Sequence, residues 1–532
     1  MSVDPTTQQA IRGLDFARTP ARSNSQSSDE AKQEDDVSVK LEQSGAVSLS
    51  SDASGSKDEV VFSEAEDKAV RRKLDLIVMP ILFLGFYVFQ LERGNISNAL
   101  TDNFLPNVGI TQDQFNTGQS LLYLGIILLE IPSNYCLQLL GPSVWLSFQV
   151  FAFGLVATLQ ALQKGYGGYL ASRIMLGVVE CGYIPGSLYV ISTFYKRNEL
   201  AARNSVFFLG SGLASATTGL LAYGLLPLGK RYPTLHGWQW MMIVEGCMAI
   251  FVSLLFASIL PASPTNPSSL LFPKLSLFNA RERQILVARV YNDDSAKKDS
   301  GKKLGVKKDI LGTLGNWRVW PHVLMAICLI GPTGAMGTYT PTLIKGFKFE
   351  TLQANALSSV AGWISLVVTF AFGYLSDKTR IRGPLVIAAI GTFWLFWVAF
   401  QQKSLSTDRW LKYGLLIMVQ GFNAAYHPLN ATWLSLNCAT PQQRSVAMAM
   451  FVMAANSGAL MGSQLLRGDD APLYRRGFKI CVCLVSLGLL VSILQHLQYR
   501  LSNRRIQSRL KDEQTDIEGD KQGLQTPRLY TI

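Results

Sequence analysis

An arginine and a glutamate stand inside one membrane-length apolar stretch, residues 168–192. These are Arg173 and Glu180, and Gly177 lies between them, so the three residues share one helix face at positions i, i+4 and i+7. A charge in such a stretch costs about 2.5–3.5 kcal/mol on insertion scales, so it needs a partner, water or a function. Two helical turns, a rise of roughly 10 Å, separate the two charges. We therefore expect Arg173 and Glu180 to act at two separate points of a helix that faces a central pathway, and not to form a direct ion pair.

Two further apolar stretches carry ionisable groups. Glu92 and Arg93 are adjacent near the end of the first stretch, and Glu130 lies near the end of the second. Adjacent residues point about 100° apart on a helix, so one of the first two can face a cavity while the other meets a neighbouring helix. The alternative is an arginine that extends to the lipid headgroups. Glu130 adds a third intramembrane carboxylate to this part of the chain, beside Glu92 and Glu180.

The tenth apolar stretch, residues 411–436, is the most polar one in the second half of the chain. Asn423, His427 and Asn430 follow the spacing i, i+4 and i+7, and Trp433 extends the same stripe. A helix would present one face of hydrogen-bonding groups with aromatic rings beside them. His427 either carries a proton or binds a substrate, or it is a neutral histidine that a neighbouring helix satisfies. The sequence leaves both interpretations open.

The composition indicates a membrane protein. Of the 532 residues, 48% are hydrophobic and 16% are charged, against about 25% charged residues in soluble domains. The apolar residues form blocks of roughly 20 with short polar links, which is the signal of transmembrane helices. The blocks are 74–98, 116–138, 143–163, 168–192, 204–227, 238–260, 320–344, 353–375, 384–402, 411–436, 445–466 and 477–498. We therefore predict an all-α membrane protein with twelve transmembrane helices in two pseudo-symmetric halves of six.

The formal net charge of +12 is better explained by membrane topology than by nucleic-acid binding, because basic residues gather in alternate loops. These loops carry Arg71, Arg72 and Lys73 before the first span, Lys196, Arg197 and Arg203 after the fourth, Lys378, Arg380 and Arg382 after the eighth, and Arg500, Arg504, Arg505 and Arg509 after the last. Twelve spans place all of them on one side, so both termini are predicted to be cytoplasmic. The seven cysteines lie in or beside apolar blocks, and their spacing indicates neither a disulfide framework nor a metal site.

Polar segments divide the chain. Residues 1–70 are rich in Ser, Asp, Glu, Gln and Lys and cannot bury a core, so we predict a disordered cytoplasmic tail. Residues 261–319 are predicted to form a basic cytoplasmic linker with one helical piece, and this linker is either solvated or in contact with anionic lipid. It separates a first six-helix bundle, 71–260, from a second, 320–499. Residues 500–532 form a second cytoplasmic tail.

The two bundles repeat each other in outline. The loop that contains Asp377 and Arg380 lies between the eighth and ninth spans, and residues 134–142 occupy the equivalent place in the first bundle. Two six-span halves with such a signal suggest parallel repeats around a site near the membrane midplane.

At this level the chain resembles the major facilitator superfamily, whose between-helix signature is similar to the loop Gly373–Arg382. More narrowly, it resembles the fungal anion:cation symporter branch typified by allantoate permease, over about residues 70–500. The matching elements are Glu92-Arg93-Gly-Asn95-Ile, Glu130-Ile-Pro-Ser-Asn134, Arg173-x6-Glu180-x-Gly182-x2-Pro185-Gly186, Tyr195-x-Arg197-x-Glu199-x3-Arg203, Gly237-Trp-x-Trp-x4-Glu245-Gly246, Trp433-x3-Asn437, Arg444, Asn456 and Asp470-Ala-Pro-x-Tyr474.

The resemblance implies proton-coupled uptake of a small organic anion, such as a carboxylate, a vitamin or a sulfonate, at the plasma membrane by a monomer without a cofactor. It implies three groups of site residues. Arg93 and Arg173 would face the anion, and the stripe of Asn423, His427, Asn430 and Trp433 would orient its neutral part. Glu180, or else Glu92 or Glu130, would carry the coupled proton. Arg197, Glu199, Arg203, Asp377 and Arg380 would belong to the cytoplasmic gate.

The chain departs from the pattern of that branch at three positions. Glu92 replaces the usual aspartate, Gln138 stands where a basic residue is common, and Gln239 replaces an arginine. The last two changes would alter locking between the halves, and none of the three touches Arg93 or Arg173. The alternative function is export of a secondary metabolite by proton antiport, which uses the same fold. The tails show no domain that a sensor would need, and no nucleophile–base pair or metal-ligand spacing favours an enzyme.

Overall fold

A computed structural model of the chain describes residues 62–196, 199–272, 277–293, 310–404, 406–438, 440–516 and 530–531. Contacts group Ala69–Ile532 into one compact unit and Met1–Lys68 into another. Most of the tail 1–70 lies outside the described residues, but the expectation of disorder is wrong for its last residues, because the first helix begins at Glu64. Helix also continues past 499, as far as Asp516.

Every expected apolar block of the first bundle is helical. The spans are α2 (Glu64–Ala99), α4 (Gln112–Leu140), α5 (Pro142–Leu159), the pair α6 (Gly165–Glu180) and α7 (Tyr183–Phe194), α8 (Leu200–Leu225) and α10 (Gly237–Ile259). Short elements connect them: η2 (Leu100–Asp102), α3 (Phe104–Val108), η3 (Gln160–Leu162) and α9 (Leu228–Arg231).

The second bundle follows the same plan. Its spans are α13 (Trp320–Gly346), α14 (Thr351–Thr379), α15 (Arg382–Lys403), the pair α16 (Arg409–Gly421) and α17 (Tyr426–Leu436), α18 (Pro441–Gly462) and α19 (Arg475–Asp516). The linker contributes α11 (Ala280–Asp293), where a helix was predicted, and α12 (Gly312–Leu314), and η7 (Gly468–Asp470) precedes the last span. Within the described residues, eleven helices are long and apolar enough to cross a membrane. The tenth expected span is not among them because it is divided.

Local sequence explains many of the helix ends. Thr111 caps α4 in a reciprocal capping box with Gln114, and the Asp408 carboxylate caps α16. Thr440 caps α18, which has a proline in its first turn. Such side chains satisfy backbone N–H groups that the first helical turn leaves without partners.

Two spans in corresponding positions of the two bundles, the fourth and the tenth, are interrupted. Between α6 and α7, Gly182 has a φ of 79°, and a Cβ there would lie 2.2 Å from the Ser133 Oγ, so both the turn and the approach require glycine. Between α16 and α17 the helix is interrupted from Phe422 to Ala425. Paired interruptions of this kind point to a binding site near the midplane of a transporter fold.

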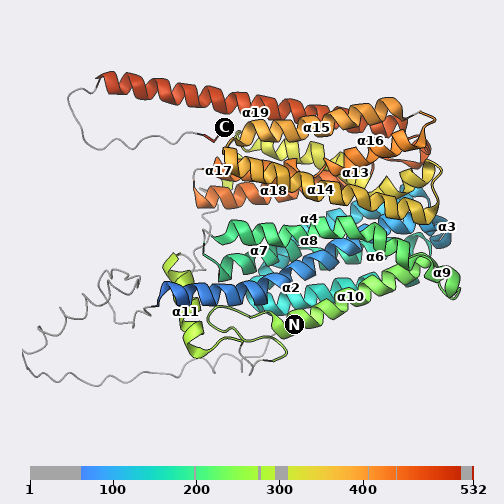
Figure 1. Ribbon diagram of the computed structural model, residues 1–532, viewed down its shortest axis with the longest axis horizontal. Coiled ribbons are helices and arrows are strands. Elements are labelled where there is room, and N and C mark those ends of the chain that lie inside the picture. The colour runs from blue at the N-terminus through green and yellow to red at the C-terminus, as the bar shows by residue number, and fades with distance from the viewer. Residues whose placement is uncertain are drawn as a thin grey trace, which may run out of the picture. The chain divides into compact units, whose positions relative to one another are not determined.

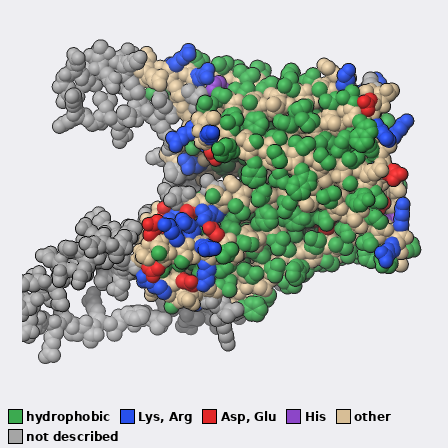
Figure 2. All heavy atoms as spheres, in the orientation of Figure 1, with side chains coloured by type: hydrophobic (Ala, Val, Ile, Leu, Met, Phe, Trp, Pro, Cys, Tyr) green, Lys and Arg blue, Asp and Glu red, His purple; other side chains and the backbone are tan. Residues whose placement is uncertain are grey.

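The surface of the compact unit fits a lipid environment. Large apolar side chains are exposed along its helices, among them Val367 at 69%, Leu128 at 65% and Phe251 at 60% of their surface. Figure 2 shows that hydrophobic side chains cover the middle of the bundle, while Lys, Arg, Asp and Glu gather at its two ends. An apolar belt between two charged ends is the pattern expected for a membrane-spanning bundle.

The two bundles lie side by side in Figure 1, the first in blue to green and the second in yellow to red. We call the end where α2 begins and α19 ends the terminal side, and the end with α3 and α9 the far side. Helix α8 packs on α14, and α4 packs on α18. A Cβ on Gly362 would lie 2.5 Å from the Ala216 backbone, so glycine allows a close approach between the bundles.

Among the described residues, hydrogen bonds between the bundles lie only on the far side. They join Gln112 and Asn116 to the Leu466 carbonyl, Asn116 to Tyr339, Ser120 to Ser463 and Gln464, Gly468 to Asp113, Tyr474 to Gln112, and Lys345 and Asn355 to Thr101. On the terminal side, no hydrogen bond or ion pair joins the bundles in the part of the chain that the structure describes. The structure is therefore closed on the far side.

Candidate functional site

The centre of the first bundle contains an ion pair between the first and fourth spans. Arg93 Nε on α2 lies 2.8 Å from Glu180 Oε2 on α6. The Glu180 side chain is fully buried, whereas 24% of the Arg93 side chain is exposed. The guanidinium also lies over the Phe89 ring, 4.5 Å from its centroid, a contact that stabilises a cation in a low-dielectric site. Arg93 is thus the member of the pair that another anion can reach.

A second group of hydrogen-bonded side chains in the site includes Glu92, the residue next to Arg93. Its Oε1 accepts a hydrogen bond of 3.0 Å from Gln160 Nε2, and Arg173 donates to the Gln160 Oε1. Arg173 also lies over the Tyr169 ring, 5.4 Å from its centroid. Glu92 and Arg173 are both buried. Adjacent residues on α2 therefore face different partners, as their 100° separation predicts.

The geometry of α6 agrees with the expectation that Arg173 and Glu180 share one face without forming an ion pair. Arg173, Gly177 and Glu180 are all buried, so they share the face that packs into the bundle. No ion pair joins Arg173 to Glu180 among the described residues, and Glu180 pairs with Arg93 instead. A Cβ on Gly177 would lie 2.6 Å from the Leu122 carbonyl oxygen. This glycine lets α6 approach α4 closely and positions both charges.

Two other carboxyl groups in the first bundle, those of Glu245 and Glu130, form no ion pair among the described residues. No hydrogen bond of standard geometry reaches the buried carboxyl of Glu245 on α10 among the described residues, although the buried Asn95 amide on α2 lies beside it. Glu130 on α4 has one buried oxygen without a hydrogen-bond partner among the same residues, close to the interruption where Ser133 Oγ donates to the Cys181 carbonyl at 2.8 Å. Unpartnered buried carboxyl groups are costly unless they change charge or ligand state. Glu245 is therefore an additional candidate, which its Gly-Trp-x-Trp motif could have indicated.

The predicted stripe on the tenth span is wrong as a single helical face. Asn423 lies in the interruption between α16 and α17, where its amide donates to Gln420 at 2.7 Å. His427 is partly buried and stacks on Phe451, with 4.8 Å between the ring centroids. Asn430 and Trp433 are fully buried and bind other groups of the second bundle. Residues on opposite sides of the interruption do not belong to one continuous helix, so the spacing i, i+4 and i+7 does not place them on one face.

Asn430 belongs to a hydrogen-bond network that the sequence did not indicate. Its Oδ1 lies 2.6 Å from His322 Nδ1 on α13, and His322 Nε2 lies 3.1 Å from the Tyr499 hydroxyl on α19. The His322 side chain is fully buried and meets the Trp433 ring edge-on at 4.9 Å. The network ties the seventh, tenth and twelfth spans together. A histidine at the start of an apolar span was its only sequence signal.

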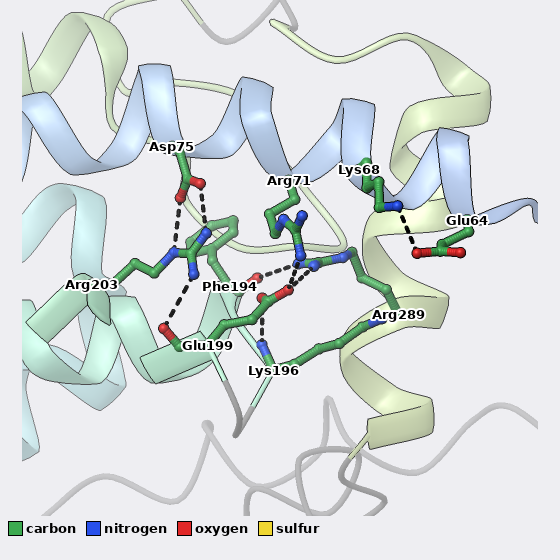
Figure 3. Close-up of polar contacts among 9 residues, drawn as sticks. All are labelled: Glu64, Lys68, Arg71, Asp75, Phe194, Lys196, Glu199, Arg203 and Arg289. Carbon is green, nitrogen blue, oxygen red and sulfur yellow. Dashed lines mark hydrogen bonds and ion pairs between the residues drawn. The ribbon is translucent and has the colours of Figure 1, made fainter. Parts of the chain in front are cut away.

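A charged cluster on the terminal side joins the first bundle to the linker (Figure 3). Glu199 Oε1, at the start of α8, lies 2.7 Å from Arg289 on α11 and 3.5 Å from Arg71 on α2. Arg203 binds Asp75 through two of its nitrogens, at 3.0 and 2.6 Å. Arg289 also donates to the Phe194 carbonyl at the end of α7 and is 1% exposed. The cluster therefore clamps three spans to the linker helix.

A second contact of the linker helix is more exposed. Lys73 lies 2.8 Å from Glu282 Oε2, and 35% and 26% of their side chains are exposed. Burial acts to raise the pKa of Glu282, but the hydrogen bonds from Lys73 and from the Asn279 N–H outweigh it, and the pKa lies below its ordinary value. The carboxylate is therefore charged at neutral pH, and the pair is an ion pair of the surface type.

Among the described residues, the gating residues expected in the first bundle form no ion pair with those expected in the second. Glu199 and Arg203 bind partners in the first bundle and the linker, and Arg197 lies outside the described residues. Asp377 pairs with Arg382 of its own loop at 2.9 Å, with 78% of the aspartate side chain exposed. Arg380 ends α14 in the left-handed conformation, with a φ of 58°. The terminal side thus holds two separate halves of the expected gate.

Replacing Arg289 with alanine is expected to lower the free energy of unfolding by about 3–5 kcal/mol, because the buried Glu199 carboxylate then loses its nearest cation. The matched change Lys73→Ala removes an exposed linker pair and is expected to cost at most about 1 kcal/mol. Thermal unfolding of the purified variants measures both. Equal shifts for the two variants would contradict the clamp.

The side chains of the site are of the types that bind anions and exchange protons. Among the residues that the structure describes, no group of three His, Cys, Asp or Glu side chains could hold a metal ion. The centre of the first bundle holds the side chains of Arg93, Arg173, Glu92 and Glu180 beside an interrupted span. Arginine forks bind carboxylates and sulfonates through charge-assisted hydrogen bonds.

Comparisons with known proteins agree with this architecture. The model of the family described as Major Facilitator Superfamily matches residues 82–463. The Uncharacterized transporter YIL166C of Saccharomyces cerevisiae is 28% identical over 464 residues, covering 86% of this chain and 85% of that protein. The MFS-type transporter cnsO of Penicillium expansum is 26% identical, covering 82% and 84%. The Major facilitator-type transporter hxnP of Emericella nidulans is 25% identical, covering 85% and 89%.

Solved structures show the same fold at low identity. The proton:xylose symporter XylE bound to 6-bromo-6-deoxy-D-glucose superposes with a TM-score of 0.59 and 17% identity, covering 78% of this chain and 94% of that chain. A bacterial homologue of the human lysosomal transporter Spinster, in an inward-facing and unoccupied conformation, gives a TM-score of 0.57 and 14% identity, covering 82% and 97%. The described helices, the interrupted fourth and tenth spans and the matched family model lead to one assignment: this chain is a transporter of the Major Facilitator Superfamily.

Proposed function

We propose that this chain carries a small organic anion together with a proton, by alternating access. The observation that carries the proposal is the ion pair of Arg93 and Glu180, in which the carboxylate is fully buried and the guanidinium is partly exposed. A buried charge pair is costly to build, and ionisable groups inside membrane spans are typically functional. An organic anion such as a carboxylate, a vitamin or a sulfonate offers the same acceptor oxygens as Glu180.

In this mechanism Glu180 and the substrate compete for one cation. Protonation of Glu180 removes its charge and weakens its hold on Arg93. The guanidinium then binds the anion, which is stabilised most when no other carboxylate is charged nearby. After the anion leaves, deprotonated Glu180 pairs with Arg93 again, so the charge of the arginine is neutralised in both states. The exchange couples one proton to one anion without any covalent step.

The remaining buried charges support the exchange. Arg173 and Glu92 are joined through Gln160, so a second cation lies in the centre of the same bundle. Glu245 lies buried on α10 beside the Asn95 amide, and we propose it as a further site for the proton. Interrupted spans leave room for the half-helices α7 and α17 to move relative to α6 and α16.

We further propose that the terminal side faces the cytoplasm and that the protein works as a monomer in the plasma membrane. Basic residues on that side support the orientation, because cytoplasmic loops carry an excess of Lys and Arg. The far side holds the hydrogen bonds between the bundles, so this conformation would receive or release its substrate on the cytoplasmic side. The resemblance to the anion:cation symporter branch supports the same class of substrate.

Proton movement in liposomes tests the proposal for several candidate substrates. The purified full-length chain is reconstituted with the pH dye pyranine inside, and nicotinate, pantothenate, allantoate, a sulfonate or neutral xylose is added outside. Symport of an anion acidifies the lumen, and xylose leaves the pH unchanged. Acidification by xylose alone would overturn the anion assignment. Alkalinisation on addition of an anion would show exchange against protons, as in the export alternative.

A further inference from the structure

Residues 530 and 531 bind to side chains of α17 and α19 on the terminal side of the second bundle. The Asn503 amide on α19 binds both backbone groups of Tyr530: its Nδ2 donates to the Tyr530 carbonyl at 2.8 Å, and its Oδ1 accepts from the Tyr530 N–H at 2.8 Å. One asparagine thus pairs with this residue as a neighbouring strand would. Asn503 is 5% exposed, so its orientation is fixed by packing.

Thr531 is bound in the same way by the end of α17. The Asn437 Oδ1 accepts from the Thr531 N–H at 2.7 Å, and its Nδ2 donates to the Thr531 carbonyl at 3.2 Å. The buried Trp433 indole donates to the same carbonyl at 2.9 Å. These contacts use only backbone atoms of Thr531. Two asparagines and a tryptophan therefore satisfy the N–H and C=O groups of two successive residues.

The side chain of Tyr530 supplies the specificity of the site. Its ring stacks on Tyr499, with 5.1 Å between centroids and 16° between planes, and the Arg318 guanidinium lies over it at 5.2 Å. A cavity of about 570 Å³ adjoins the two residues, and Arg380, Arg500 and Arg504 lie on its wall. An aromatic side chain between a tyrosine and an arginine is held by stacking and by its attraction to the cation.

We propose that this surface is a peptide-binding site whose ligand is the chain's own segment at 530–531, and that its occupation holds α17 against α19. Backbone pairing together with one aromatic pocket is the usual way in which proteins recognise an extended peptide. The groups that form the site come from three spans: Arg318 precedes α13, Trp433 and Asn437 end the α17 half-helix, and Tyr499 and Asn503 belong to α19. The bound segment thus bridges elements that are far apart in sequence.

Helix α17 is the element that this contact constrains. It has 11 residues, begins after the interruption in the tenth span and is isolated from α16 by that interruption. Its terminal-side end is tied to α19 through the peptide segment, and its middle is tied to α13 through Asn430 and His322. Release of the segment removes its hydrogen bonds to Trp433, Asn437 and Asn503 and leaves the direct edge-on contact of Trp433 with Tyr499, with 5.5 Å between the ring centroids. The half-helix then opens more often, because local opening follows the number of buried contacts and hydrogen bonds.

A fluorescence experiment tests the docking in the full-length chain. Cys136, Cys247 and Cys483, the native cysteines that are not buried, are replaced with alanine, and Thr531→Cys is labelled with bimane, which nearby tryptophan quenches. We expect quenched emission in the otherwise unaltered chain, and a rise in Asn437→Ala/Asn503→Ala toward the level of Trp433→Phe. Gln507→Ala is the matched control, because Gln507 lines the same cavity but has no hydrogen bond to the segment among the described residues.

A peptide of residues 525–532, added in excess, is expected to displace the labelled segment and raise its emission, and the same peptide with Tyr530→Ala is expected to have no effect. This arm uses the folded chain without changes to its pocket. Hydrogen exchange then measures the consequence: amide exchange in α17 should be about tenfold faster after release, with α16 unchanged. Emission that is unquenched from the start would overturn the docking, and unchanged exchange in α17 would overturn its effect on that helix.

Discussion

Arg93→Ala is expected to reduce anion uptake by about 100-fold, which corresponds to the loss of about 3 kcal/mol from charge-assisted hydrogen bonds to the substrate. The reason is the position of Arg93: it is the partly exposed member of the buried ion pair, 2.8 Å from Glu180. Initial rates of uptake, in liposomes or in cells that lack their own carrier, measure the effect at equal amounts of protein in the membrane.

A loss of folding would imitate this result, and a double variant separates the two causes. Arg93→Ala alone leaves the Glu180 carboxylate buried without its cation, which is destabilising. Arg93→Ala/Glu180→Gln removes both charges, so its thermal midpoint should return toward that of the unaltered chain while transport stays lost. Recovery of transport in the double variant would show that Arg93 serves only to neutralise Glu180, and would contradict its role as the anion-binding group.

Glu180→Gln is expected to abolish the dependence of uptake on the proton gradient. Glutamine keeps the size of the side chain and a hydrogen-bond acceptor for Arg93, but it cannot exchange a proton. Arg93 then binds the anion in every state, so facilitated exchange of the anion persists while accumulation against its gradient is lost. The ratio of accumulated to external substrate, measured at two external pH values, one acidic and one neutral, gives the result.

Glu130→Gln and Glu245→Gln are the matched controls for the coupling residue. All three carboxyl groups lie in spans of the first bundle, but among the described residues only Glu180 forms an ion pair with an arginine of the site. We expect both control variants to retain the response to pH, with a weaker response in Glu245→Gln because of its proposed auxiliary role. Loss of coupling in Glu130→Gln with normal coupling in Glu180→Gln would move the proton site to the second span.

The sequence was sufficient for the spans and for the buried charges of the first bundle. Apolar blocks of lipid-crossing length predict helices directly, because the membrane allows few other structures. Arg173, Gly177 and Glu180 share a buried face, as their spacing predicts. Gly182 lies at the interruption of the fourth span, where few other residues adopt its φ of 79°.

The interruption of the tenth span was missed, and the error changed the predicted site. The residues within it, Phe422 to Ala425, include neither glycine nor proline, so the stretch was treated as one helix. Gly421 before the interruption and Pro428 in the first turn of α17 were the available signals, because proline is tolerated there and disfavours helix before it. With the helix divided, Asn423 and His427 no longer share a face.

Partners distant in sequence could not be predicted from spacing at all. Arg289 reaches Glu199 across 90 residues, and Gln160 bridges Glu92 and Arg173 from a short element after the third span. Nothing in a single sequence pairs such residues, because tertiary packing decides which polar groups meet. The segment at 530–531 was likewise treated as part of a cytoplasmic tail, because nothing in the sequence pairs it with Asn437 or Asn503.

The far-side contacts have a consequence for how the transport cycle responds to ionic strength. Most of them are hydrogen bonds of amides, hydroxyl groups and backbone carbonyls, and the ion pair found across that side, Arg467 with Asp113 at 3.6 Å, is half exposed. Salt screens exposed charges but leaves neutral hydrogen bonds nearly unchanged. Opening of the far side therefore has a free-energy cost that varies little between dilute and saline surroundings.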